Sequence, residues 1–327
     1  MARCLQLAEN GRGTTYPNPM VGSVIVRDQK IISEGWHHSP GRRHAEAEAI
    51  YKCDPSQLQG ATLYVNLEPC NHVGKTEACA PLIVAAGIKK VVVGSGDTHD
   101  KVNGSGIAHL KKHGIEVITG VLKAECRELN KRFFRFHEQK RPYITLKWAE
   151  TKNAYVAPLT KKELRPVWIS NEYARQHTNF LRSQEQAILV GHKTWTQDNP
   201  RLSAYRWNEN NPVIVILGGV QPQDATGATL TDKQPEDKKI IWLSSDVHQG
   251  PRAVADKLHA LDIQSVLIEG GPQTLQRFID ANLWDECYRY QSQDLWAEGL
   301  SGPRINVPLT PIANFEDNVL YHAKNQT

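Results

Sequence analysis

The sequence contains no apolar run that approaches the roughly 20 residues needed to cross a lipid bilayer. Its first residues, MARCLQLAENG, lack the apolar core of a secretory signal peptide. The six cysteines are spread over 327 residues, which excludes the dense disulfide framework of a small secreted domain. We therefore expect a cytoplasmic protein with reduced thiols and no membrane partner.

An excess of charge of either sign is also lacking. The chain has 39 Lys and Arg residues against 35 Asp and Glu residues, and it contains no basic block of the kind that marks a nucleic-acid-binding tail. Charged residues make up 23% and apolar residues 40% of the chain, which is typical of a globular protein. This balance suits an acidic small-molecule ligand at least as well as nucleic acid.

The length and the order of sequence patterns indicate two α/β domains. A charged helix at 123–142, ended by Pro142, separates two series of alternating strands and helices, and we expect domains at 1–140 and 141–327. The first series predicts strands at 20–28, 30–36, 61–69, 89–95 and 115–120 and helices at 44–52, 80–87 and 105–113. The second predicts strands at 143–150, 186–191, 211–219, 238–245 and 265–271 and helices at 170–184, 253–262 and 274–283.

One short part of the first domain contains the donors of a catalytic zinc site. A zinc ion that activates water takes three protein ligands and leaves one position open, and thiolates with an imidazole are suitable donors. Zinc nucleobase deaminases carry them as H-x-E followed by P-C-x-x-C. This chain has His-Ala-Glu at 44–46 and Pro-Cys at 69–70, with the second cysteine displaced to 79. We predict that His44, Cys70 and Cys79 bind zinc; a structural zinc site or two unrelated buried thiols are the alternatives.

Glu46 is predicted to carry the proton in this chemistry. Bound zinc lowers the pKa of its water to about 7, and a nearby carboxylate can move the proton of that water to the ring nitrogen and the departing ammonia. Side chains two residues apart, such as His44 and Glu46, do not share a face in the middle of a helix. The site is therefore expected at the first turn of the helix that follows Arg42 and Arg43.

Residues 71–78 must loop outward if Cys70 and Cys79 bind one metal ion. This loop contains His72 and Lys75. Cations at the rim of a deaminase pocket suggest a substrate with a phosphate group, which they would bind by charge-assisted hydrogen bonds. A solvated loop lysine is the alternative.

Four stretches together resemble the deaminase domain of the bifunctional riboflavin-biosynthesis deaminase/reductases: TTYPNPMVGSVIV, GWHHSPGRRHAEAEAI, LYVNLEPCNHVGKTEACA and AAGIKKVVVGSGD. The resemblance implies a cytidine-deaminase-like three-layer α/β/α domain. It also implies that the substrate is 2,5-diamino-6-(5-phosphoribosylamino)pyrimidin-4-one and that it is contacted by Asn18, His37, His72 and Lys75. The family usually has Asp-Pro-Asn-Pro where this chain has Asp-Thr-His-Asp at 97–100.

The second domain contains a weaker signal of its own. Glu269, Gly270 and Gly271 lie between an apolar strand and the start of a helix. Paired glycines at such a place let backbone N–H groups approach a phosphate, although an ordinary tight turn is the alternative. The usual dinucleotide fingerprint G-x-G-x-x-G is absent from the sequence.

The stretches RPYITLKWAE, PVWIS, FLRS, QAILVGHKTWTQDNPRL and LIEGG occur in the order found in the reductase domain of the same family. This implies a dihydrofolate-reductase-like α/β domain that uses NADPH to convert the ribosylamino group into a ribitylamino group. Hydride would be delivered, after ring opening, to the ribose carbon bonded to nitrogen. The implied NADPH contacts are Trp168, Thr194, Asp198, Gly270 and Gly271, and the implied substrate contacts are Lys147, Arg182, Leu202 and Glu269.

The second domain also departs from the family pattern. Asn153 and Ala154 stand where Asp-Gly is usual, Asn199 replaces the second Asp of Asp-Asp-Pro, and Tyr205 stands where an arginine is expected. A lost carboxylate or a shifted guanidinium would weaken substrate placement by about 1–3 kcal/mol each if those groups pair with charge.

Three interpretations remain at the level of sequence. The leading one is a two-step enzyme of riboflavin synthesis that uses Zn²⁺ and NADPH. The second keeps the deaminase but makes the other domain a degenerate scaffold, and the third is a nucleic-acid-editing deaminase, which requires a basic groove with adjacent aromatic residues. We expect a phosphorylated pyrimidine substrate, a homo-oligomer and no nucleic-acid partner.

Overall fold

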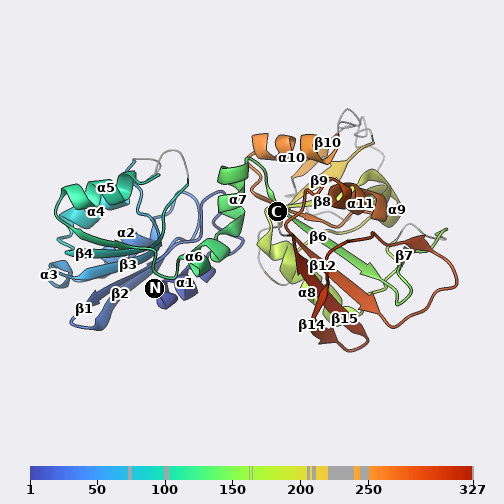
Figure 1. Cartoon of the computed structure of the whole chain (residues 1–327), viewed down its shortest axis with the longest axis horizontal. Helices are drawn as coiled ribbons and strands as arrows, with labels where there is room; N and C mark the ends of the chain where they lie inside the picture. Colours follow the sequence, from blue (N-terminus) through green and yellow to red (C-terminus); the bar gives the residue numbers. More distant parts are fainter. Residues whose placement is uncertain are drawn as a thin grey trace. The chain divides into compact units, whose positions relative to one another are not determined.

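The computed structural model describes residues 1–72, 76–98, 103–161, 163, 165–204, 207, 211–219, 239–243 and 250–325. The chain divides into two compact units, Met1–Lys140 and Arg141–Thr327 (Figure 1). In the described part of the first unit the strands are β1 (Gly22–Arg27), β2 (Lys30–Trp36), β3 (Thr62–Leu67), β4 (Lys90–Ser95) and β5 (Glu116–Thr119). The helices are α1 (Ala2–Glu9), α2 (Ala45–Lys52), α3 (Pro55–Leu58), α4 (Cys79–Ala85), α5 (Ser105–Lys112), α6 (Lys123–Leu129) and α7 (Lys131–Gln139).

These strands form one sheet in the order β2-β1-β3-β4-β5. β1 is antiparallel to β2 and β3, whereas β3, β4 and β5 are parallel. Successive side chains of a strand point to opposite faces, and Leu63 and Val65 accordingly pack with α2, α4 and α5 while Tyr64 packs with α1. The sheet therefore lies between two layers of helices, which confirms the predicted three-layer fold.

The predicted helix at 123–142 is wrong, because the chain breaks it at Asn130 into α6 and α7. The Asn130 side chain accepts a hydrogen bond from the Met20 backbone N–H at 2.8 Å and donates one to the Met20 carbonyl oxygen at 2.9 Å. Asn is a poor residue for a helix interior because its amide competes for backbone partners. Here the partner is 110 residues away in the sequence. Helices α1 and α3 were not predicted.

In the second unit the described strands are β6 (Tyr143–Glu150), β7 (Tyr155–Ala157), β8 (Ala187–Gly191), β9 (Val213–Leu217), β10 (Ile240–Leu243), β11 (Ser265–Ile268), β12 (Glu286–Ser292), β13 (Leu300–Ser301), β14 (Thr310–Phe315) and β15 (Asn318–Lys324). The helices are α8 (Glu172–Gln184), α9 (His192–Asp198), α10 (Pro251–Ala260) and α11 (Pro272–Asp280). The five predicted strands and three predicted helices are all present. Strand β7, helix α9 and the strands after α11 were missed.

The main sheet of the second unit has the order β10-β9-β8-β11-β6-β12-β15-β14. The six strands from β10 to β12 are parallel to their neighbours, and the last two are antiparallel. One face packs Leu146, Leu189 and Val266 with α10 and α11, and the other packs Ile188 and Leu267 with α8 and α9. Because parallel strands end at the same edge of a sheet, the residues after β8, β9 and β11 come together there.

Ala154, which stands where the family has glycine, adopts a left-handed conformation with φ +64° in the turn between β6 and β7. This conformation costs an L-residue with a Cβ atom about 1–2 kcal/mol. Glycine avoids that cost, but the greater conformational entropy of its unfolded chain lowers the free energy of unfolding by about 0.4–1 kcal/mol. We expect Ala154→Gly to raise the free energy of unfolding of the second unit by about 0.5–1 kcal/mol.

Denaturant unfolding followed by fluorescence measures this change, because all but one of the eight Trp residues lie in the second unit. The control is Ala157→Gly in β7, where φ is not positive and glycine should destabilise the strand. An equal loss of stability in both variants would contradict the argument from backbone strain.

Candidate active sites

The three predicted zinc ligands meet at the amino ends of two helices. His44 is the N-cap residue of α2, Cys79 is the first residue of α4, and Cys70 follows β3. Nδ1 of His44 lies 3.5 Å from Sγ of Cys70 and 3.4 Å from Sγ of Cys79. All three ligand atoms lie within 4.8 Å of one another.

This donor set fits a catalytic zinc ion. Two thiols and one imidazole are soft donors, and among the described residues the group of candidate ligand side chains has three members, the number that a catalytic zinc site takes from the protein. Hydrogen bonds from Cys79 and His44 lower the pKa of the Cys70 thiol, and the thiolate is the form that binds metal. The other ring nitrogen of His44, Nε2, lies 3.4 Å from Thr76 Oγ1, an outer contact that orients the ring.

Glu46 lies in the first turn of α2, where the sequence argument expected it, and its side chain is only 3% exposed. Burial raises the pKa of Glu46 to about 7, and its carboxyl group is hydrogen-bonded to Cys79. A carboxyl group that titrates near neutral pH is suited to take up and release a proton.

Two of the predicted substrate contacts are hydrogen-bonded to each other. Nδ2 of Asn18 lies 2.9 Å from Nε2 of His37, whose Nδ1 lies 3.1 Å from the Arg43 carbonyl oxygen. The His37 and His44 rings meet edge to face at 5.4 Å. His72 has a buried Nδ1 atom without a hydrogen-bond partner among the described residues. Lys75 lies outside the described residues.

Glu68 supports this site and was missed. Its buried carboxylate precedes Pro69 and Cys70 and accepts backbone N–H bonds from Gly104, Gly106 and Ile107 at 3.0–3.2 Å. It thereby fixes the start of α5 beside the segment that carries Cys70. A glutamate directly after an apolar strand was the available signal, but its backbone donors, Asp97 included, lie 29–39 residues further along the chain.

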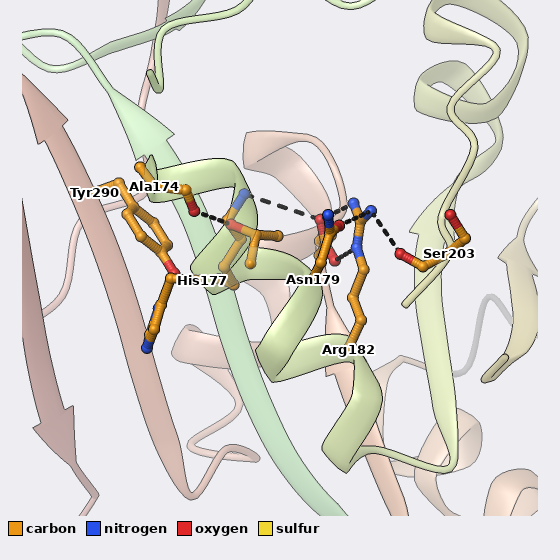
Figure 2. A network of polar contacts seen from close by, with 9 residues as sticks. Ala174, His177, Asn179, Arg182, Ser203 and Tyr290 are labelled. Carbon is orange, nitrogen blue, oxygen red and sulfur yellow. Dashed lines mark hydrogen bonds and ion pairs between the residues drawn. The ribbon is translucent and has the colours of Figure 1, made fainter. Parts of the chain in front are cut away.

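In the second unit three predicted substrate contacts form a buried charge cluster. Arg182, which is labelled in Figure 2, donates from Nε and Nη2 to the two carboxylate oxygens of Glu269 at 2.6 and 2.8 Å. Lys147 Nζ lies 3.9 Å from Glu269 Oε2. Although burial favours the neutral acid, Arg182 and Lys147 lower the pKa of Glu269. Burial lowers the pKa of Lys147, and Glu269 opposes that shift. Two cations against one carboxylate leave the cluster with an excess of positive charge.

The predicted cofactor contacts lie mostly around the ends of β8 and β11. A Cβ atom added to Gly271 would lie 3.3 Å from Thr194 Oγ1 of α9, and one added to Gly270 would lie 3.0 Å from Thr274. Gly271 is the N-cap residue of the nine-residue helix α11. Glycines therefore allow close packing at this turn, but Pro272, the first residue of α11, has no backbone N–H to offer a phosphate.

The other predicted contacts of this unit differ in their exposure and in the residues that they contact. Trp168 is 61% exposed and stacks on Arg175, whereas Asp198 is engaged in an ion pair with Lys161. The Leu202 side chain is buried in the core at 2% exposure, so only its main chain is available to a ligand. Tyr205 lies outside the described residues, and so do positions 99 and 100 of the first unit.

The first sheet is flanked by helices and has a three-donor metal site, and the second is a mainly parallel sheet with a Gly-Gly turn between β11 and α11. Together they define a two-domain enzyme of the zinc deaminase and nucleotide-dependent reductase classes. Residues 1–95 match the family model described as the cytidine and deoxycytidylate deaminase zinc-binding region, and residues 142–292 match that of the RibD C-terminal domain. The riboflavin biosynthesis protein RibD of Actinobacillus pleuropneumoniae is 42% identical over 331 residues, which cover 94% of this chain and 86% of that protein.

Two further relatives agree. The diaminohydroxyphosphoribosylamino-pyrimidine deaminase of Buchnera aphidicola is 47% identical over 135 residues, which cover 41% of this chain and 91% of that protein. A deaminase/reductase structure from Thermotoga maritima superimposes with a TM-score of 0.85 at 32% identity, covering 99% of this chain and 97% of that one. The chain belongs to the RibD family of bifunctional riboflavin-biosynthesis enzymes, which combine a deaminase with a reductase.

The family settles the coarse functional questions. Its deaminase binds zinc and its reductase uses NADPH, and neither a scaffold domain nor nucleic-acid editing is favoured. Among the described residues, none of the helices is long and apolar enough to cross a membrane.

Proposed function

We propose that the first unit deaminates 2,5-diamino-6-(5-phosphoribosylamino)pyrimidin-4-one and that the second reduces the product, 5-amino-6-(5-phosphoribosylamino)uracil, with NADPH. The observation that carries the proposal is the meeting of two thiols and an imidazole nitrogen beside the buried carboxyl group of Glu46. The two activities named for the T. maritima relative support it. The functional domains would be residues 1–140 and 141–327.

In the deaminase site, His44, Cys70 and Cys79 would hold zinc. Bound zinc makes hydroxide available at neutral pH. Glu46 would accept a proton from the attacking water and deliver it to the ring nitrogen, and it would then carry a second proton from the new hydroxyl group to the amino group that leaves as ammonia. Burial lowers the pKa of His37, which keeps this ring neutral near pH 7, and its hydrogen bond with Asn18 orients both side chains toward the pyrimidine.

In the reductase site, Lys147, Arg182 and Glu269 would hold the phosphorylated substrate. NADPH supplies the hydride when it is bound. The excess positive charge of the cluster suits an anionic ligand, because a buried cation is stabilised by an opposite charge within about 4–6 Å. The Gly270-Gly271 turn and Thr194 would contact the cofactor phosphates, with Trp168 and Asp198 beside them, and the main chain at Leu202 would contact the substrate.

The finer assignments rest on the residue types. His72 and Lys75 would bind the substrate phosphate at the rim of the deaminase pocket. We further propose that the protein acts in the cytoplasm as a homo-oligomer without nucleic acid, since its net charge is small and its chemistry is that of small-molecule metabolism.

Product analysis with and without NADPH tests the proposal. We expect the diaminopyrimidine substrate to release ammonia in both reactions and to yield the ribitylamino product only when NADPH is present. Purified deaminated substrate should oxidise NADPH without any release of ammonia. Deamination without NADPH oxidation at saturating substrate would restrict the function to the first unit.

A further inference from the structure

Tyr290 of β12 is a fully buried polar side chain to which the mechanism above gives no role. β12 pairs in parallel with β6, so that Tyr288 lies opposite Lys147 and Tyr290 lies opposite Ala149. Because side chains alternate between the faces of a strand, Tyr290 and Lys147 share one face of the sheet. The Tyr290 ring lies next to the charge cluster of Lys147, Arg182 and Glu269.

Of the two cations in this cluster, Lys147 makes the weaker contact with Glu269. Both oxygens of Glu269 already accept hydrogen bonds from Arg182, and Arg182 also donates to Asn179 Oδ1 at 3.4 Å and to the Ser203 carbonyl oxygen at 3.3 Å (Figure 2). Lys147 reaches Glu269 only at 3.9 Å. Its Nζ lies over the Tyr290 ring at 5.3 Å from the centroid, within the roughly 6 Å over which a ring face attracts a cation.

The ring of Tyr290 is itself fixed in orientation. Its hydroxyl oxygen lies 2.6 Å from Nδ1 of His177 on α8, and the ring stacks on Phe315 at 6.4 Å and 28°. Figure 2 shows His177 beside Tyr290, with Arg182 on the same helix, α8. Because Arg182 donates to the carboxylate of Glu269, α8 contacts both Tyr290 and the charge cluster.

We propose that Tyr290 is a positioning residue of the reductase site, whose ring face holds the Lys147 ammonium group in place for the anionic substrate. The inference rests on the proposed role of Lys147 in binding that substrate. Tyr290 acts through Lys147 and does not itself touch the reacting atoms.

The first test compares two truncations of the ring, Tyr290→Leu and Tyr290→Met, with Tyr290→Phe, which keeps the ring face. We expect both truncations to raise the reductase KM for 5-amino-6-(5-phosphoribosylamino)uracil by about tenfold or more. The reductase kcat and the KM for NADPH should change by less than about threefold, because the loss is one of substrate binding. Tyr290→Phe should stay within about threefold of the parent KM. A Phe variant as impaired as the truncations would overturn the role of the ring.

The second test is a double-mutant cycle with Lys147→Met, in which the tryptophan fluorescence of each sample confirms that the second unit is folded. If Tyr290 acts through Lys147, truncating Tyr290 in the Lys147→Met background should raise the KM by less than about twofold further. The same factor in both backgrounds would overturn the inference while leaving the role of Lys147 intact. An unchanged KM in Lys147→Met alone would instead overturn the proposed substrate contact, so the two failures are distinguishable.

Discussion

Replacement of Glu46 by Gln is expected to lower the deaminase kcat by about 10²–10⁴-fold, the usual contribution of a positioned proton carrier. Gln has the same shape as Glu and fits the buried first turn of α2, but its amide cannot accept and return the proton. Zinc content should not change, because His44, Cys70 and Cys79 supply the ligand atoms. The measurements are steady-state ammonia release and metal analysis of the same sample.

Glu48→Gln is the matched control for this prediction. Glu48 lies on the same helix, where it forms an ion pair with Lys52, and its loss should leave both activities unchanged. The reductase activity of Glu46→Gln should also be unchanged. Loss of zinc from Glu46→Gln would show that this residue supports metal binding, and full deaminase activity would show that another group moves the proton.

A large loss of stability is expected from Asp285→Asn in the second unit. Asp285 and Arg141 form a buried bidentate pair, with Nη1–Oδ2 and Nη2–Oδ1 distances of 2.7 and 2.9 Å. Asp285 also accepts a hydrogen bond from the Ile144 backbone N–H at 2.7 Å. The neutral amide would leave the Arg141 charge buried without its counter-ion. We expect the free energy of unfolding to fall by about 3–5 kcal/mol.

Denaturant unfolding followed by tryptophan fluorescence measures this loss. The control is Asp256→Asn, which removes an exposed i,i+4 pair with Arg252 and should cost less than about 1 kcal/mol. Replacement of both buried partners by apolar residues, Arg141→Met with Asp285→Leu, should recover most of the stability, because no unpaired charge remains. A double variant as unstable as Asp285→Asn would show that the hydrogen bonds, more than the lone charge, determine the loss.

The sequence was most informative where the structural signal is local. Three kinds of signal depend only on neighbours within a few residues, and the elements they indicate were all predicted. They are the alternating apolar and polar side chains of β1 and β2, the helix that begins after His44, and the apolar runs of β3, β4, β8, β9 and β11. The donors His44, Cys70 and Cys79 were identified from their chemistry and order along the chain. That the three donors meet had to be inferred, because the eight residues between the cysteines do not show whether the chain brings Cys79 back to Cys70.

The errors have a common physical cause. Asn130 ends a helix because its amide binds the backbone of Met20, and Glu68 is buried because backbone N–H groups near α5 neutralise its charge. The strands after α11 were missed because β12, β14 and β15 are stabilised by the strands beside them more than by their own composition.

The amino-acid sequence by itself determined the class of chemistry, the donor set of the metal site, the two-domain order and most of the regular elements. Only the tertiary structure decided that Lys147, Arg182 and Glu269 form one cluster and that Tyr290 and His177 support it. These residues come from β6, α8, β11 and β12, which are separated by up to 143 positions in the sequence. Hydrogen bonds and ring contacts act over a few ångströms, and the fold alone sets which distant side chains come that close.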